Sequence, residues 1–297
     1  MKSNTDAAVL SPARARTSDF VTLAKPRLNL LVVGSAVAGY AMAGGDSGQV
    51  FRLLSTILGT GLVAGGASAY NQILERDADA LMQRTRLRPL PDGRLQVGEA
   101  LLFATALSSL GLATLAVGVN ALCALVALAT LVSYVVIYTP LKRVTSFATV
   151  IGAIPGALPP VIGWVAAREE LSQGAWLLFG IVFLWQLPHF LSIAWLFRDD
   201  YARAGFVMLP VLEPDGRSTG RQTVIYAAAL VPMSLAPTLI GLTGRAYFAG
   251  ALALAAIFMT LAVKFALSRS RPDAKRLFFG SIIYLPLLWI LMIVNRV

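Results

Sequence analysis

Apolar residues occur in long stretches along most of the chain, and short polar segments between them carry most of the charges. A helix that crosses the hydrocarbon core of a bilayer needs about 20 mostly apolar residues. Nine stretches meet or nearly meet this length, at residues 28–44, 51–72, 99–118, 120–139, 145–167, 172–196, 222–243, 247–267 and 277–295. The pattern therefore predicts an all-α, polytopic membrane protein with nine transmembrane helices.

The composition supports this interpretation. Hydrophobic residues make up 57% of the chain and charged residues 13%, whereas soluble domains have roughly 25% charged residues. Too few polar residues remain to cover a water-soluble surface. The polar segment 1–24 lacks an apolar signal-peptide core, so we expect a flexible cytoplasmic tail over 1–24, with a very short surface helix as the alternative, and one membrane domain over 25–297.

The positive charges indicate the orientation of the chain. The net charge is +10, with 25 Lys and Arg residues, and cytoplasmic segments of membrane proteins are rich in these residues. If the N-terminus is inside, only four of them fall outside, namely Arg52, Arg168, Arg245 and Arg296. We therefore predict a multi-pass protein of the cell inner membrane with a cytoplasmic N-terminus and a periplasmic C-terminus. Topology accounts for the basic excess, so no nucleic-acid partner is expected.

The end of the second apolar stretch carries an unusual row of polar residues. Asn71, Glu75 and Asp79 are spaced four apart, so they share one face of a helix, while Asp77 points elsewhere. Like charges at this spacing repel, and Mg²⁺, which prefers oxygen ligands and bridges carboxylates to phosphates, would offset them. The alternative is a solvated loop of mixed charge. The row begins inside an apolar stretch, where ionisable groups are costly and usually functional, and this favours a metal site.

A second acidic pair, Asp199 and Asp200, follows the sixth stretch on the same predicted side of the membrane. The two acidic segments lie four stretches apart in parallel orientation, which suggests a weak internal repeat. Basic residues flank both, at Arg84, Arg86, Arg88, Lys142, Arg143, Arg198 and Arg203. Carboxylates close to Arg and Lys side chains suit a metal-bound diphosphate.

Several motifs together resemble those of the UbiA intramembrane prenyltransferases. The run Asn71-x-x-x-Glu75-x-Asp77-x-Asp79 is similar to the first aspartate-rich motif of this family. The other motifs resemble the branch that modifies heme, and they are Tyr138-Thr139-x-x-Lys142-Arg143, Gly156-Ala157-x-Pro159-Pro160, Trp185-Gln186-x-Pro188-His189 and Asp199-Asp200-Tyr201. They occur in family order across about residues 21–297. Because no single motif carries the likeness, it is specific.

The resemblance implies a fold and a reaction. Nine helices would enclose a cavity open laterally to lipid, and Mg²⁺ would hold the diphosphate of farnesyl diphosphate. Ionisation would give an allylic cation that a vinyl group of heme b attacks, with water supplying a hydroxyl, to form heme O. A heme A synthase and assembly factors of heme-copper terminal oxidases are the implied protein partners.

The resemblance also assigns roles to residues. The implied metal ligands are Asn71, Glu75, Asp79, Asp199 and Asp200, and the implied catalytic residues are Asn71, Glu75, Asp79, Lys142 and Asp200. The implied diphosphate-binding residues are Arg84, Arg88, Tyr138, Lys142, Arg143, Arg198 and Arg203. Many relatives have D-x-x-x-D as the second motif, whereas here Arg203 stands four residues after Asp199. A symmetric two-metal site is therefore in doubt.

His189 is the only histidine and lies inside the sixth stretch. A buried lone histidine is often structural, but ionisable residues within a membrane tend to be functional and imidazole is a common ligand of heme iron. We expect His189, Gln186 and Trp185 to contact heme, with Gln186 as partner of the second ring nitrogen. The competing hypotheses are prenyl transfer to another acceptor, such as a quinone precursor, and transport of an anion.

Overall fold

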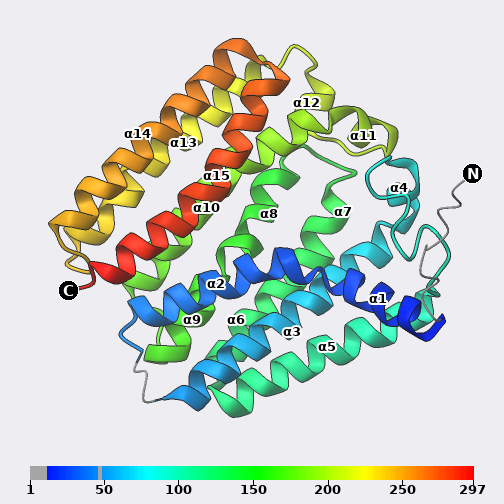
Figure 1. Cartoon of the computed structure of the whole chain (residues 1–297), viewed down its shortest axis with the longest axis horizontal. Helices are drawn as coiled ribbons and strands as arrows, with labels where there is room; N and C mark the ends of the chain where they lie inside the picture. The colour runs from blue at the N-terminus through cyan, green and yellow to red at the C-terminus, as the bar shows by residue number, and fades with distance from the viewer. Residues whose placement is uncertain (1–11, 46–48) are drawn as a thin grey trace, which may run out of the picture.

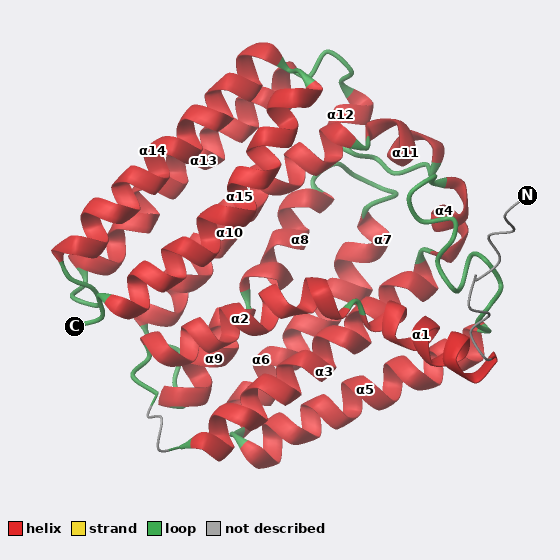
Figure 2. Ribbon diagram, viewed as in Figure 1, coloured by secondary structure: helices red, strands yellow, loops and turns green. Residues whose placement is uncertain are grey.

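The computed structural model describes residues 12–45 and 49–297, and in these ranges the chain is almost entirely helical (Figures 1 and 2). The helices are α1 (Pro12–Ala24), α2 (Pro26–Met42), α3 (Val50–Leu74), α4 (Arg76–Leu81), α5 (Val97–Gly118), α6 (Ala121–Val132), the π-helical turn η1 (Ser133–Tyr138), α7 (Thr139–Leu141), α8 (Ala148–Ala157), α9 (Pro159–Arg168), α10 (Gln173–Leu196), α11 (Arg198–Arg203), α12 (Leu209–Leu212), α13 (Arg217–Leu239), α14 (Arg245–Ser268) and α15 (Arg271–Val294).

Nine helical segments of the described residues are long and apolar enough to cross a membrane. Each overlaps one of the nine apolar stretches, so the prediction of an all-α, multi-pass membrane protein is confirmed. Three of the nine segments are interrupted. The first is broken at Lys25 between α1 and α2, the fourth contains the turn η1, and the fifth is divided at Leu158, which is followed by Pro159 at the start of α9. A proline removes a backbone donor and is tolerated in the first helical turn, which explains the break at Leu158.

The N-terminal segment differs from the flexible tail predicted over 1–24. Residues 1–11 lie outside the described part of the chain, but Pro12–Ala24 form helix α1. The helix is attached to the rest of the molecule: Leu23 is fully buried, and Asp19 pairs with Arg94 at 3.1 Å. Since these partners are far along the chain, the polar composition of 12–24 could not reveal the attachment.

The long helices pack side by side, with their ends at two opposite edges (Figure 1). Helix α3 packs on α2 and α5, while α10 packs on α8, α13 and α15. The short helices α4, α11 and α12 lie along one edge, at the upper right of Figure 1. The polar loops that carry both acidic motifs therefore meet at the same end of the helix bundle, as the sequence predicted.

Helices α3 and α10 end in the same way. Each stops at one non-helical residue, Glu75 with φ −100° and ψ 6° and Phe197 with φ −114° and ψ 23°, and a six-residue helix follows. The carboxylates of interest lie on these short helices or at the break, so the two breaks position the candidate site.

Candidate functional site

The predicted row of polar residues forms one buried face at the end of α3. Asn71, Glu75 and Asp79 are 3%, 6% and 0% exposed, whereas the side chain of Asp77 is 82% exposed. The amide of Asp79 donates to the carbonyl of Glu75 at 2.7 Å, so helical spacing continues across the break. The structure therefore places these three side chains together and Asp77 outside.

Glu75 forms an ion pair with Lys142. The Nζ atom of Lys142 donates to Glu75 Oε1 at 2.7 Å, and both side chains are largely buried. Nζ also lies 4.5 Å from the centroid of the Tyr138 ring. Nearby, Asn71 Nδ2 donates to Thr139 Oγ1 at 3.2 Å. The end of α3 is therefore joined to the segment that follows η1, and the family motif Tyr138-Thr139-x-x-Lys142 becomes one wall of the site.

Lys142 is positively charged in this environment. Burial lowers the pKa of Lys142, but the neighbouring Tyr138 phenol and the Glu75 carboxylate raise it by more. The net pKa lies above the ordinary range of a lysine because the ammonium form has a carboxylate partner. A buried, permanent cation is thus available beside the polar face of α3.

Asp79 is fully buried and only partly satisfied. Arg88 donates to Asp79 Oδ2 at 2.6 Å, and Thr85 Oγ1 donates to the Asp79 carbonyl at 2.9 Å. The other carboxylate oxygen, Oδ1, is buried with no hydrogen-bond partner among the described residues. An unsatisfied buried carboxylate oxygen is costly. Together with the oxygens of Asn71 and Glu75, it fits the donor set of a divalent cation such as Mg²⁺.

Lys25 belongs to the same charged cluster, although the sequence analysis did not assign it a role. It separates α1 from α2 in a left-handed conformation, with φ 47°. Its ammonium group interacts electrostatically with Arg88, Lys142, Glu75 and Asp79. The sequence signal was Lys25 followed by Pro26, a helix-start pattern at the end of a polar segment. We call Lys25, Glu75, Asp79, Arg88 and Lys142, with Asn71, the inner cluster.

An apolar cavity of about 280 Å³ adjoins the inner cluster. Lys25 lies at its charged end, and Ala64, Ala67 and Ser68 line it one and two turns before Asn71 on α3. Tyr134 of η1 and Phe190 of α10 contribute aromatic walls. A second groove, of about 260 Å³, lies between α2 and α15. The molecule thus contains an apolar space that leads away from concentrated charge.

The second acidic motif is separate from the inner cluster. Asp200 is 8% exposed, accepts from the Gln83 amide at 3.2 Å and pairs with Arg203. The side chain of Asp199 is 73% exposed and lies 3.8 Å from Arg198. No three His, Cys, Asp or Glu residues of the described chain gather closely enough to hold one metal ion. Asp199 and Asp200, as adjacent residues of a helix, point apart, and their role as metal ligands stays a prediction.

These residues line an open polar cavity of about 530 Å³, which we call the outer cavity. Arg84, Arg203 and Arg271 contribute their side chains to it, and Leu196 and Phe197 form an apolar side. Arg271 begins α15 and was not among the predicted site residues. Its position could not be read from the sequence because it lies 68 or more residues from the others.

The remaining predicted diphosphate-binding residues lie away from the inner cluster. Arg143 is exposed, and the guanidinium of Arg198 covers the Trp195 ring at 4.5 Å. Arg84 similarly lies 4.9 Å from the centroid of the Phe197 ring. Of the basic residues predicted to bind diphosphate, the structure brings Arg88 and Lys142 to the buried carboxylates.

The three predicted heme-contacting residues lie on two different faces of α10. Trp185 and His189 face α15, where Trp185 Nε1 donates to the Ser281 carbonyl at 2.9 Å and His189 Nδ1 lies 2.7 Å from Ser281 Oγ. The His189 ring is stacked between the rings of Trp185 and Phe278, at 5.3 and 5.2 Å.

Gln186 faces α8 instead, and its Nε2 donates to the Ala153 carbonyl at 2.7 Å. The expectation that Gln186 is the partner of His189 is therefore wrong. Positions 186 and 189 are only about 60° apart around the helix, but the Gln186 side chain reaches the backbone of α8 and the His189 ring reaches α15. The partner is Ser281, which is 92 positions along the chain.

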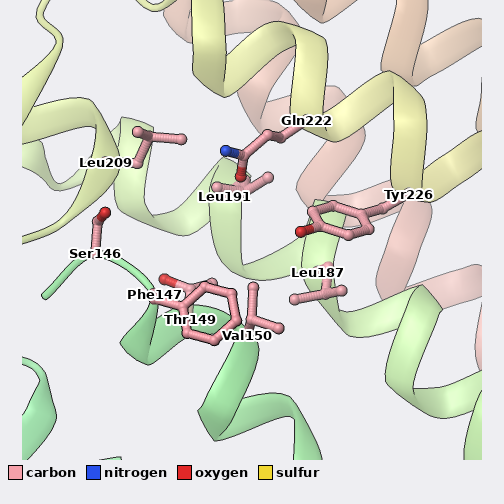
Figure 3. Close-up of a pocket in the computed structure, with 9 residues that line it drawn as sticks. All are labelled: Ser146, Phe147, Thr149, Val150, Leu187, Leu191, Leu209, Gln222 and Tyr226. Atoms are coloured by element: carbon pink, nitrogen blue, oxygen red, sulfur yellow. The ribbon is translucent and has the colours of Figure 1, made fainter.

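A further pocket of about 140 Å³ lies between α8, α10, α12 and α13 (Figure 3). Ser146 and Gln222 contribute polar groups, and the Tyr226 ring borders the space beside Leu187 and Leu191. None of the predicted site residues lines it. It is small and uncharged, so we place the candidate site at the inner cluster.

Comparison with known proteins assigns the class. Residues 32–284 match the sequence profile of the UbiA prenyltransferase family. The chain belongs to the UbiA prenyltransferase family. A curated relative from Solibacter usitatus (strain Ellin6076), named protoheme IX farnesyltransferase, is 48% identical over 287 residues, which covers 94% of this chain and 98% of the relative. The family resemblance of the motifs is thereby confirmed.

Solved structures share the fold. One, described as digeranylgeranylglyceryl phosphate synthase in membranes, matches with a TM-score of 0.79 at 16% identity, over 95% of this chain and 98% of that one. A UbiA homologue from Archaeoglobus fulgidus bound to GPP and Mg²⁺ matches with a TM-score of 0.66 at 18% identity, over 92% and 99% of the two chains. Prenyl diphosphate and Mg²⁺ are thus bound by a protein of this fold.

Proposed function

We propose that this protein transfers the farnesyl group of farnesyl diphosphate to a vinyl group of heme b and so makes heme O. The C–O bond between farnesyl and diphosphate breaks, a carbon–carbon bond forms to the vinyl group, and water supplies a hydroxyl. The proton of that water leaves with the diphosphate, so the products are heme O and protonated diphosphate. The name of the 48% identical relative supports the choice of acceptor.

The observation that carries the proposal is the inner cluster at one end of the apolar cavity. Two half-buried cations, Arg88 and Lys142, pair with the carboxylates of Asp79 and Glu75, and the Lys25 side chain lies beside them. When the diphosphate binds, these cations stabilise the negative charge that develops as the C–O bond breaks. Mg²⁺, held by the oxygens of Asn71, Glu75 and Asp79, would supply further charge neutralisation of the leaving group.

The cavity next to the cluster suits the rest of the substrate. Its walls of alanine, proline and aromatic side chains give a prenyl chain an apolar surface. Walls of this kind also keep water from the allylic cation until the new bond has formed. Tyr134 and Phe190 line the cavity, and the faces of aromatic rings attract cations.

We assign His189 to contact with the heme ring or its iron. Ser281 engages Nδ1, which leaves Nε2 as the nitrogen for a ligand. In the purified protein, heme b should then give an absorption spectrum of nitrogen ligation, and His189→Ala should alter it. An unchanged spectrum in this variant would leave His189 as a packing residue.

The proposal includes the cellular setting. With the charge distribution described above, the inner cluster faces the cytoplasm of a cell with an inner membrane, and the C-terminus is periplasmic. Heme O would pass to a heme A synthase or to assembly factors of a terminal oxidase. A reporter fused after Val297 should therefore read as periplasmic.

The direct test is mass analysis of the heme after incubation. Detergent-solubilised protein receives heme b, farnesyl diphosphate and Mg²⁺, and the expected product is heavier by one farnesyl group and one hydroxyl. Omitting Mg²⁺ with a chelator should abolish it. If a quinone precursor is prenylated and heme b is not, the acceptor assignment is wrong. If no acceptor is prenylated and an anion crosses vesicle membranes, the protein is a transporter.

A further inference from the structure

We propose that Arg84 and Arg271, on the outer cavity, bind the two propionate carboxylates of the heme acceptor. The inference rests on the proposed function, because it deepens the choice of acceptor. It assigns Arg84 to the acceptor, where the family resemblance had implied the diphosphate, and it gives a role to Arg271, which no motif includes. The outer cavity is thereby an acceptor site distinct from the inner cluster.

The two arginines are available for a ligand. Neither forms an ion pair with any residue in the described part of the chain. Arg203, the third arginine of the cavity, already pairs with Asp200, and Asp199 is beside Arg198. Two guanidinium groups without carboxylate partners therefore line one cavity of about 530 Å³. A guanidinium binds a carboxylate through two parallel hydrogen bonds, which suits one propionate for each arginine.

The apolar side of the outer cavity fits the rest of such a ligand. The guanidinium carbon of Arg84 lies 4.9 Å from the centroid of the Phe197 ring, so an aromatic side chain supports this cation at the cavity. Leu196 lies beside Phe197 in the cavity wall. A molecule with an apolar ring and carboxylates on one edge matches this arrangement of charge and apolar surface.

The outer cavity also lies on the same faces of α10 and α15 as His189, about two helical turns away. Leu196 is seven residues after His189 on α10, and Arg271 is seven residues before Phe278 on α15. Seven residues are two helical turns, about 10 Å along the axis. His189 and Leu196 therefore share one face of α10, and Arg271 and Phe278 share one face of α15. His189 of α10 stacks on Phe278 of α15. The outer cavity and His189 therefore lie along the same interface between α10 and α15. Carboxylates at the outer cavity would direct the ring of the acceptor toward this interface.

The competing interpretation is that these arginines bind the diphosphate. The inner cluster already pairs Arg88 and Lys142 with the buried carboxylates, and Arg84 and Arg271 form no ion pair with Glu75 or Asp79. Both arginines are exposed, as expected for a site that receives the charged edge of an amphipathic molecule from the membrane surface.

The test compares heme b with its dimethyl ester, in which both propionates are uncharged. Wild-type protein in detergent is titrated with each compound, followed by heme absorption, and should prefer heme b. Arg84→Gln and Arg271→Gln should each weaken heme b binding about tenfold, the effect of losing one charge-assisted contact, and leave ester binding unchanged. Lys275→Gln, an exposed and unpaired cation on the same helix, is the matched control and should bind both compounds as wild type does.

Two results would overturn the inference. Either wild-type protein binds heme b and its ester equally, or the variants keep their heme preference while the KM for farnesyl diphosphate rises. The second result would assign the arginines to the diphosphate. Failure of the proposed function looks different: wild-type protein would then bind neither heme compound. Thermal unfolding of each variant, measured in parallel, identifies any loss of fold.

Discussion

The ends of α3 and α10 have the same shape but different chemistry. Each helix stops at a single residue, Glu75 or Phe197, and continues into a six-residue helix that begins with Arg and Asp. In both, this first Asp is exposed and paired with the Arg before it. When the two breaks are superposed in sequence, Phe197 stands where Glu75 is, and Tyr201 stands where Asp79 is. The positions of the buried Glu75 and Asp79 therefore carry aromatic residues at α10, where the buried carboxylate is Asp200, one residue after the exposed Asp199.

The same one-residue break in a helix thus positions two different sites, the inner cluster and the outer cavity. At α3, the carboxylates point inward and are held by Lys142 and Arg88. At α10, aromatic residues occupy those positions, and the charge moves to an open cavity lined by arginines. The break in the helix positions the site. The side chain at the break and the side chain four residues later determine what the site binds.

The largest expected effect is at the inward carboxylates. Glu75→Gln and Asp79→Asn should each lower turnover about 100-fold, because each leaves a buried cation uncompensated and removes a metal ligand; loss of such contacts costs roughly 1.5–3 kcal/mol apiece. Initial rates with saturating heme b measure this. Asp77→Asn is the matched control, since its side chain is 82% exposed, and should stay within about twofold. A loss at Asp77 as large as that at Glu75 would contradict the buried-face geometry.

An intermediate effect is expected at Lys25, which contributes to the inner cluster only. Lys25→Gln removes an amine that a bound diphosphate would hold in its ammonium form. The substitution should raise the KM for farnesyl diphosphate about tenfold, with little change in heme binding. Arg27→Gln, two residues away and exposed, should leave both constants unchanged. If Lys25→Gln weakens heme binding instead, Lys25 contributes to binding of the heme acceptor. The ends of α3 and α10 would then not bind separate substrates.

The smallest effect is expected at the second acidic motif. Asp200 accepts from the Gln83 amide and pairs with Arg203, so Asp200→Asn should loosen the loop between α4 and α5 and lower turnover about threefold to tenfold, as loss of one partly exposed charged contact does. Asp199→Asn should change it by less than about twofold because that side chain is exposed. Equal, large losses at both positions would indicate a second metal-binding pair and would erase the contrast between α3 and α10.

Much of the fold was predictable because membrane-spanning helices satisfy their own backbone hydrogen bonds. An apolar stretch of sufficient length then has one available structure, and all nine predicted stretches correspond to apolar helices. Helix α1 was foreseen only as an alternative to a flexible tail, for the same reason. Its polar sequence carries no such signal, and its attachment depends on the pairing of Asp19 with Arg94, which is 75 positions away.

Within the site, local spacing was a good guide and distant pairing was not. The four-residue spacing of Asn71, Glu75 and Asp79 correctly predicted a common helix face, since a shared face depends only on helix geometry. The association of Gln186 with His189 was wrong, because each side chain has its partner on a different neighbouring helix, α8 for Gln186 and α15 for His189. Lys25 and Arg271 were missed because their places in the site depend on how separate helices pack.

The π-helical turn η1 has a consequence for insertions and deletions. Its hydrogen bonds reach one residue further than those of an α-helix: the amide of Thr139 donates to the carbonyl of Tyr134, five residues before it. The turn thus holds one residue more than a regular helix would, and it rotates all that follows by roughly 100°. Removing a single residue between Ser133 and Tyr138 would keep the span helical and apolar, yet it would turn the Lys142 ammonium away from Glu75. Chain length in this segment is therefore under a constraint that hydropathy does not record.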